Sequence, residues 1–211
     1  MYNNKPLAAL TFDDGPNTVT TPQVIDKLEK YGVIASFFLI GDNINDKSAE
    51  GPRRAFKMGC EIHNHSRTHT AMPKLTASEM KAEIDYTNKK IEKITGVTPK
   101  FFRPPYIAVS ADMYVNIVLP FIAGIGAEDW LDEVSAEMRA QKILAQVQDG
   151  SIILLHDMIG NYRTVDALDI IIPEMLSRGF EFVTVSELFR LENVEPVSGR
   201  VYSNVFQTTE Y

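Results

Sequence analysis

Short apolar runs alternate along the chain with longer segments in which apolar residues recur at helical spacing. The clearest runs are Leu7–Phe12, Ala35–Gly41, Phe121–Gly126, Ser151–Asp157 and Phe180–Val185. Strands without a polar face are typical of parallel sheets that helices cover on the outside. The pattern therefore predicts buried parallel strands.

The segments between these runs predict helices. In the first of them Val24, Ile25, Leu28 and Tyr31 share one helical face, and Gly32 is placed to end the helix. The strand that precedes this helix and the strand that follows it would then be connected by a crossover, as in a βαβ unit.

Boundary signals extend this pattern to the rest of the chain. Thr76–Glu79 is a capping box that predicts the start of a long helix. Ser186 is a candidate N-cap for the last helix. Cys60–His65 and Lys100–Tyr106 complete the set of expected strands, and two prolines interrupt the latter.

Strand and helix alternate about seven times. We therefore predict an α/β fold, a distorted (β/α) barrel, closed or incomplete, with about seven parallel strands. An open doubly wound sheet is the alternative, but it would usually bring a glycine-rich phosphate loop after the first strand. No repeat or linker divides residues 1–211, so we expect one domain; the segment 193–211 either packs on the barrel or leads to another domain.

Composition excludes several classes of function. The formal net charge of −7 argues against a nucleic-acid partner and disfavours a polyanionic substrate. No apolar run is long enough to cross a membrane, and the N-terminus shows no signal-peptide pattern. Cys60, the one cysteine, can form no internal disulfide.

Polar clusters follow five of the predicted strands. They are Asp13-Asp14, His65 with His69, Arg103, Asp129-Trp130 and His156-Asp157. In a parallel barrel the carboxyl ends of the strands surround one mouth, where catalytic groups collect. The sequence therefore predicts that the five clusters share one site.

His65 and His69 are spaced so that both imidazoles can face one way over a helical or tight turn. With a carboxylate from another strand they would form an Asp-His-His metal site that leaves coordination positions open. One of Asp13 and Asp14 can then ligate the metal while the other accepts a proton from the water that the metal activates. The structural alternative is a turn at Asp-Gly-Pro, which explains one aspartate but not both.

Together "TFDDGP", "HSRTH", "RPPY", "DW" and "LLHD" resemble, in this order, the polysaccharide deacetylases of carbohydrate esterase family 4, the NodB-homology domain. The resemblance covers the chain from about Leu7 to Leu191. Within the family, "KFFRPP" and "DGSIILLHD" are most similar to bacterial acetylxylan esterases. The resemblance implies metal-dependent removal of acetyl groups from an acetylated polysaccharide.

The resemblance also implies a role for each matching residue. The metal ligands would be Asp14, His65 and His69, and the catalytic base would be Asp13. His156 would be the general acid, Arg103 would hold the base, and Asp129 would keep the acid protonated. Substrate binding would use Trp130 and Leu154, which enclose the acetyl methyl, and the backbone N–H of Tyr106, which stabilises the oxyanion.

Other assignments stay open from the sequence. Zinc suits the Asp-His-His set, and cobalt or nickel would fit the same ligands. Deacetylation of chitin oligomers or peptidoglycan is the first alternative to acetylxylan. The same ligand set occurs in two-His-one-carboxylate iron oxygenases, and an inactive carbohydrate-binding domain is a further possibility. A monomer is favoured, and the expected substrate suggests an extracellular location.

The chain departs from the usual family pattern at the mouth. Gly126 stands where an aspartate often precedes the Asp-Trp pair, and Ile107 stands where a glycine often follows the tyrosine of "RPPY". Neither position matches a metal ligand. We therefore expect the differences to affect the shape of the substrate site and not the metal chemistry.

Overall fold

The computed structural model describes residues 5–209. Within this part of the chain nine strands form one sheet. The strands are β1 (Leu7–Asp13), β2 (Ser36–Leu39), β3 (Glu61–Asn64), β4 (Phe121–Ile122), β5 (Ile125–Gly126), β6 (Ser151–His156), β7 (Glu181–Phe182), β8 (Val201–Asn204) and β9 (Gln207–Thr209).

Seven α-helices and three 3₁₀ turns connect these strands in the described residues. The helices are α1 (Thr20–Tyr31), α2 (Glu50–Lys57), α3 (Ala77–Thr95), α4 (Ala111–Asn116), α5 (Ala136–Gln146), α6 (Tyr162–Ser177) and α7 (Val185–Leu191). The 3₁₀ turns are η1 (Gly41–Asn43), η2 (Met72–Lys74) and η3 (Pro105–Ile107). Within residues 5–209 no helix combines the length and the apolar character that a membrane span requires.

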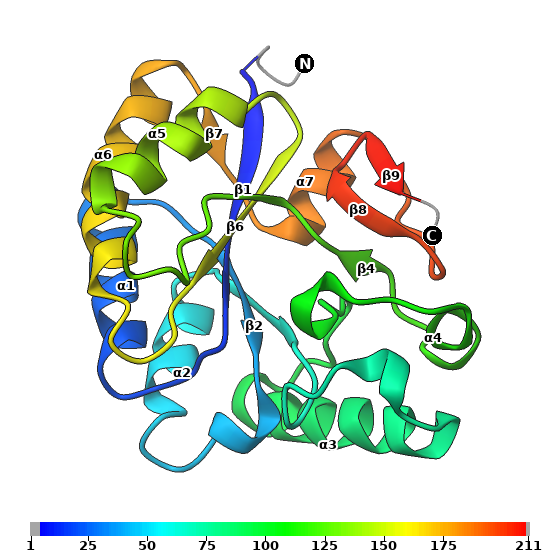
Figure 1. Ribbon diagram of the computed structural model, residues 1–211. Helices are drawn as coiled ribbons and strands as arrows, with labels where there is room; N and C mark the ends of the chain where they lie inside the picture. Colours follow the sequence, from blue (N-terminus) through cyan, green and yellow to red (C-terminus); the bar gives the residue numbers. More distant parts are fainter. Residues whose placement is uncertain (1–4, 210–211) are drawn as a thin grey trace.

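The sheet is curled and mostly parallel, in the order β3-β2-β1-β6-β8-β4. Between β3 and β4 no strand intervenes in the described residues, and Phe102 forms single bridges to Asn64 and to Phe121. Figure 1 shows α1, α5 and α6 on one side of β1 and β6, and the β8–β9 hairpin on the other. The predicted α/β fold, a distorted and incomplete barrel, is confirmed.

Both faces of the central strands are buried, which explains their continuous apolar runs. On one face Leu10 and Ile153 pack into a cluster with residues of α1, α5 and α6. On the other face Ala9 and Ile152 pack against α7 and Tyr202. Successive side chains of β1 and β6 point alternately to the two clusters, as the strand period of two requires. Apolar side chains therefore pack on both faces of the sheet.

Three expected elements differ from the structure. Lys100–Tyr106 is not a strand, because Pro104 and Pro105 have no N–H to donate and only Phe102 forms bridges. Phe121–Gly126 is split into β4 and β5. Gly124 lies between them with φ of 141°. The last helix begins two residues earlier than expected, since its N-cap is Thr184, which forms a capping box with Glu187, and not Ser186.

The C-terminal segment packs on the barrel. β8 pairs in parallel with β4 and antiparallel with β9, and Asn204 pairs antiparallel with Ser151 of β6. Together with the split of β4 and β5, this hairpin gives nine strands where about seven were predicted. Residues 1–4, which belong to the N-terminus assessed for a signal peptide, lie outside the described residues.

Candidate active site

The predicted polar clusters lie at the carboxyl ends of the parallel strands. Asp13 ends β1 and His156 ends β6, and the two residues are partners in the parallel register. His65 follows β3, and Arg103 donates a backbone hydrogen bond of 3.0 Å to the carbonyl of Asn64 at the end of that strand. The sheet therefore brings these side chains to one mouth of the barrel.

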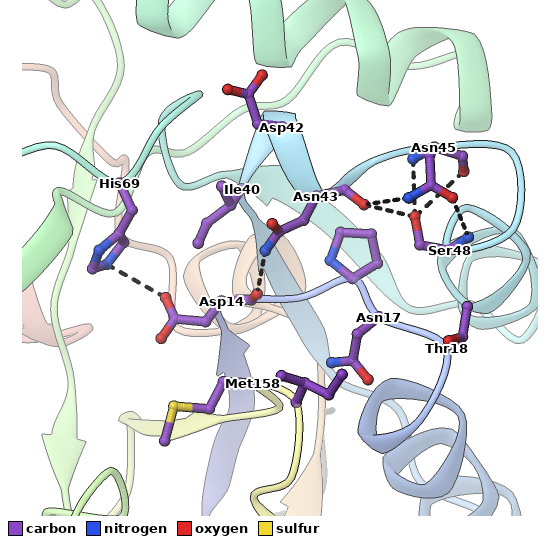
Figure 2. Close-up of a pocket in the computed structure, with 12 residues that line it drawn as sticks. Asp14, Asn17, Thr18, Ile40, Asp42, Asn43, Asn45, Ser48, His69 and Met158 are labelled. Carbon is purple, nitrogen blue, oxygen red and sulfur yellow. Dashed lines mark hydrogen bonds and ion pairs between the residues drawn. The ribbon is translucent and has the colours of Figure 1, made fainter.

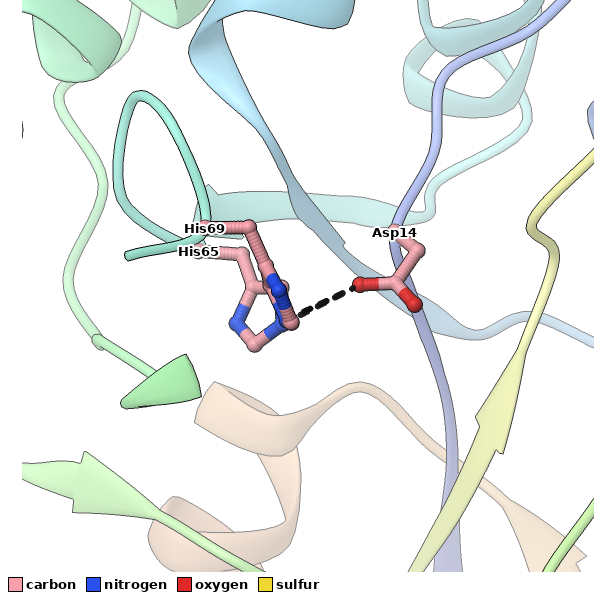
Figure 3. A group of neighbouring side chains, drawn as sticks. All are labelled: Asp14, His65 and His69. Carbon is pink, nitrogen blue, oxygen red and sulfur yellow. Dashed lines mark ion pairs between the residues drawn. The ribbon is translucent and has the colours of Figure 1, made fainter. Parts of the chain in front are cut away.

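Asp14, His65 and His69 form the one candidate metal cluster found among the described residues (Figure 3). Each can offer a ligand atom, and the ligand atoms lie within 4.8 Å of one another. The Nε2 atoms of His65 and His69 are each 3.4 Å from Oδ1 of Asp14. That oxygen is buried and has no hydrogen-bond partner, so the donor set fits a bound cation.

The loop after β3 sets the direction of the two imidazoles. Nδ1 of His65 lies 2.8 Å from the carbonyl oxygen of Arg103 and must donate to it, which leaves Nε2 free to act as a ligand. Oγ of Ser66 accepts a 3.0 Å hydrogen bond from the backbone N–H of His69. Ser66 and His69 have left-handed φ values of 65° and 60°. The two histidines therefore lie on a tight turn and not on a helix.

The protonation states also favour metal ligation. Burial would raise the pKa of Asp14, but the interaction with His65 outweighs burial and the pKa is lowered to about 2. Burial lowers the pKa of His69, and the charge of His65 adds to this effect. Near neutral pH the cluster therefore offers a carboxylate and a neutral imidazole, which are the forms that bind metals.

Asp13 lies beside this cluster and is held by Arg103. Nη1 of Arg103 donates to Oδ1 of Asp13 at 2.6 Å, and both side chains are buried. The same guanidinium donates to the carbonyls of Ile122 and Ala123. Oδ2 of Asp13 lies 3.8 Å from Nε2 of His65. The arginine therefore occupies one carboxylate oxygen and leaves the other toward the metal cluster.

Asp129 holds His156, which is the register partner of Asp13 on the neighbouring strand β6. Nδ1 of His156 lies 2.7 Å from Oδ1 of Asp129, and its backbone N–H donates to Oδ2 at 2.8 Å. Burial lowers the pKa of His156, but the hydrogen bond and charge of Asp129 outweigh burial and raise the pKa to about 9. The imidazole is therefore charged near neutral pH.

Three residues behind Asp129 were not predicted. Oγ1 of Thr164 donates to Oδ2 of Asp129 at 2.7 Å, and Nδ2 of Asn161 donates to the carbonyl of His156 at 2.9 Å. Arg139 is buried and donates to both Asn161 and Thr164. These residues lie on α5 and around the start of α6. No local pattern in the sequence relates them to Asp129.

Trp130 and Leu154 flank His156. The indole of Trp130 meets the imidazole edge to face, with ring centroids 5.5 Å apart, and is 51% exposed. Leu154 is two residues before His156 on β6, so both side chains leave the same face of the strand. An exposed aromatic ring and a buried leucine thus provide apolar surface next to the candidate acid.

Tyr106 lies at the edge of the metal cluster. Its ring centroid is 4.6 Å from that of His69, and the side chain is 70% exposed. Tyr106 and Ile107 have successive φ values of 61° and 52°, which non-glycine residues seldom adopt. This strained turn replaces the predicted strand, and the ring of Tyr106 lies beside His69.

A groove of about 520 Å³ opens next to Asp14 and His69 (Figure 2). Its walls come from the loops after β1, β2 and β6 and include Asn17, Asp42 and Ile159. The candidate metal cluster is therefore accessible from the surface through this groove.

The comparisons with known proteins agree on one family. Residues 2–118 match the family model described as "Polysaccharide deacetylase". A bifunctional xylanase/deacetylase of Pseudobutyrivibrio xylanivorans is 51% identical over 203 residues, which are 96% of this chain and 34% of that protein. The peptidoglycan-N-acetylmuramic acid deacetylase PdaC of Bacillus subtilis is 37% identical over 88% of this chain and 39% of its own length. This chain therefore spans between a third and two fifths of these two relatives.

The fold agrees with a solved structure over the whole barrel. A family 4 acetyl xylan esterase from Clostridium thermocellum in complex with a cobalt ion has a TM-score of 0.92 and 45% identity. The match covers 94% of this chain and 98% of that one. The family model, the sequence identities and the shared fold lead to the same conclusion, which the motifs at the strand ends suggested. The chain belongs to the polysaccharide deacetylase family, carbohydrate esterase family 4.

Proposed function

We propose that this protein is a metal-dependent esterase that removes O-acetyl groups from xylan. The observation that carries the proposal is the arrangement of the mouth. The cluster of Asp14, His65 and His69 lies next to Asp13, which Arg103 holds, and His156, which Asp129 holds. The similarity to a xylanase/deacetylase and to an acetyl xylan esterase supports the choice of substrate.

Asp14, His65 and His69 would hold the divalent cation. Two imidazoles and one carboxylate suit zinc, and cobalt or nickel can use the same ligands. We propose zinc as the resident ion, and the cobalt ion in the related esterase supports a divalent cation of this type. When bound, such a cation lowers the pKa of a water molecule and polarises the acetyl carbonyl.

The remaining residues of the mouth have complementary tasks in ester hydrolysis. Oδ2 of Asp13 accepts a proton from the attacking water, while Arg103 holds the other carboxylate oxygen in place. Water oxygen forms the new bond to the carbonyl carbon, and the ester bond to the sugar oxygen breaks. Nε2 of His156, charged because Asp129 holds Nδ1, gives its proton to that sugar oxygen. The products are acetate and a free sugar hydroxyl.

Trp130, Leu154 and Tyr106 would position the acetyl group. A methyl group has little apolar surface, so one indole and one leucine beside His156 are sufficient to enclose it. The backbone N–H of Tyr106 would donate to the developing oxyanion, which needs positive charge and a donor aimed at it. The contact of the Tyr106 ring with His69 puts this residue next to the metal cluster, which supports the role.

The finer proposals concern the polymer and the setting of the enzyme. The net charge of −7 favours a neutral polymer such as xylan. We propose that residues 1–211 form one catalytic domain, monomeric and extracellular, because polymeric xylan lies outside cells. Deacetylation of amino-sugar polymers is the second candidate, and the 37% identity to a peptidoglycan deacetylase favours it as the alternative.

The proposal is tested by acetate release from acetylated xylan and from N-acetylglucosamine oligomers, before and after the metal is removed and restored. We expect metal-dependent release from xylan and little from the oligomers. Release mainly from the oligomers would keep the mechanism and overturn the substrate. No release from either by the metal-loaded protein would overturn the enzymatic function.

Asp13→Asn and Asp42→Asn form a matched pair for this assay. Both remove a carboxylate near the candidate metal site, but only Asp13 contacts Arg103 at 2.6 Å. We expect Asp13→Asn to lower kcat at least about 100-fold, the usual contribution of a general base. Asp42→Asn should stay within a few-fold of the wild type, and an equal loss in both variants would contradict the assignment of the base.

A further inference from the structure

Asp157 is a buried carboxyl group that has no role in the proposed hydrolysis. It follows His156 in the sequence and is 0% exposed. Its Oδ2 accepts a hydrogen bond from Oγ1 of Thr21, whereas Oδ1 has no hydrogen-bond partner. A buried polar atom without a partner costs about 1–3 kcal/mol. Stability alone therefore does not explain a carboxyl group here.

The side chain of Asp157 occupies the space beneath Gly15. A Cβ atom added to Gly15 would lie 2.6 Å from Oδ2 and 2.7 Å from Oδ1 of Asp157. Such distances are shorter than real contacts, so the loop can take this path only because position 15 has no side chain. The carboxyl group of Asp157 thus packs against Gly15, the residue that follows the candidate metal ligand Asp14.

A hydrogen-bond relay connects the same carboxyl group to the end of this loop. Oγ1 of Thr21 donates to Asp157 and accepts from the backbone N–H of Asn17 at 3.0 Å. The backbone of Asp157 adds two contacts, since its N–H donates to the carbonyl of Asp13 at 3.0 Å and its carbonyl accepts from Nδ2 of Asn17 at 2.7 Å. The loop from Asp13 to Asn17 is held at both ends.

Asp14 needs such support because its backbone conformation is unfavourable. Its φ of 71° lies in the left-handed region, which costs a non-glycine residue about 1–2 kcal/mol. Strained residues keep their conformation only where their surroundings determine it. On the other side of the loop, Nδ2 of Asn43 donates to the carbonyl of Asp14 at 2.8 Å. The backbone of Asp14 is thus fixed on one side by the packing of Asp157 against Gly15 and on the other by the hydrogen bond from Asn43.

We propose that Asp157 is a positioning residue for the metal ligand Asp14. Its carboxyl group fills the space beneath Gly15 and, through Thr21, fixes Asn17. The left-handed turn at Asp14 then directs Oδ1 to the two imidazoles. The inference rests on the proposed function, because it assigns Asp157 a part in metal affinity at the proposed site. No covalent step involves Asp157.

The test is cobalt binding to the metal-free protein, measured by calorimetry and by the visible absorption spectrum of the bound ion. Asp157→Ala should weaken cobalt binding at least about tenfold, because residues that support metal ligands contribute 10–100-fold. Thr21→Val should also weaken it, and Thr21→Ser, which keeps the hydroxyl group, should restore it. The Thr21 pair provides the test even where Asp157→Ala fails to fold.

A double-mutant cycle examines the packing under the loop directly. Gly15→Ala should weaken cobalt binding, since the new Cβ would meet the carboxyl oxygens of Asp157. Gly15→Ala in the Asp157→Ala background should cost less, because those oxygens are gone. An equal loss of cobalt affinity in the two backgrounds would contradict the packing of the Asp157 carboxyl group against Gly15.

Glu61→Gln is the control for a general loss of stability. Glu61 is a largely buried carboxylate bonded to His63 and to the N–H of Ser186, at the opposite end of β3 from His65. It should leave cobalt affinity within about twofold. Cobalt affinities of Asp157→Ala and Thr21→Val within that range of the wild type, or an equal loss in Glu61→Gln, would overturn the inference. Absence of cobalt binding by the wild type would overturn the proposed function itself.

Discussion

At the scale of single residues, the mouth separates two carboxylates by giving each a different partner. Asp13 has a buried guanidinium at 2.6 Å, and Asp129 has an imidazole at 2.7 Å. The first pairing fixes the candidate base, and the second raises the pKa of the candidate acid, His156. A base and an acid that have different partners in one site are typical of acid–base catalysis.

The pKa of His156 is the first consequence that can be measured. In the metal-free protein we expect a value of about 9 by NMR titration, because Asp129 outweighs the burial of the imidazole. Asp129→Asn removes that charge and leaves burial opposed only by the charges of Asp13 and Asp14, so the pKa of His156 should fall. His156 loses its proton as the pH rises, and the falling limb of kcat/KM should therefore move to lower pH in the variant. An unchanged titration would contradict the pairing.

Arg103 provides a prediction of stability. Arg103→Met leaves the buried Asp13 carboxylate and the carbonyls of Ile122 and Ala123 without their donor. Breaking a buried ion pair on one side costs about 3–5 kcal/mol, and urea unfolding should show this loss. Arg163→Met is the control, since its ion pair with Asp132 is exposed and contributes at most about 1 kcal/mol. Similar losses of unfolding free energy in both variants would show that the buried ion pair of Arg103 stabilises the fold no more than the exposed pair of Arg163 does.

At the scale of elements, the sequence predicted the strands and helices whose signals lie in a short local pattern of residues. The strands around Leu10 and Ile153 are continuous apolar runs, and Thr76 with Glu79 is the capping box that starts α3. The candidate ligands could be predicted because each follows such a strand. By contrast, the contact of Thr164 with Asp129 joins residues 35 positions apart and has no local signal.

Elements that depend on tertiary context were missed for the same reason. The hairpin of β8 and β9 is determined by its pairing with β4 and β6, and not by a strong apolar run. Phe121–Gly126 has the composition of one strand, yet Gly124 adopts φ of 141° where the backbone of Ile152 approaches. Close contacts of this kind come from the fold and leave no pattern in a single sequence.

Gly124 therefore gives a prediction at this scale. A Cβ at this position would lie 2.7 Å from the carbonyl oxygen of Ile152. Gly124→Ala should lower the free energy of unfolding by about 2–5 kcal/mol, because backbone strain and overpacking add. Gly96→Ala is matched in having a left-handed φ of 75°, but nothing lies within 4 Å, so it should cost only about 1–2 kcal/mol. Equal costs in urea unfolding would contradict the role of the close approach.

At the scale of the whole molecule, the candidate metal ligands join segments that are distant in the sequence. Asp14 follows β1, and His65 and His69 lie on the loop after β3. Both segments contribute to the mouth of the same barrel, whose closure between β3 and β4 depends on the single bridges of Phe102. A cation bound here would connect two parts of the barrel that unfolding separates.

Metal binding should consequently stabilise the whole fold. A ligand that binds only the folded state adds about 2.7 kcal/mol at a free concentration 100 times its Kd. For a domain of this size 1 kcal/mol raises Tm by about 2–4 °C, so saturating zinc or cobalt should raise the Tm of the metal-free protein by about 5–11 °C. Asp14→Ala removes one ligand and should abolish the shift, whereas Asp42→Asn, which changes a carboxylate in the adjoining groove, should retain it. A full shift in Asp14→Ala would place the cation elsewhere in the protein.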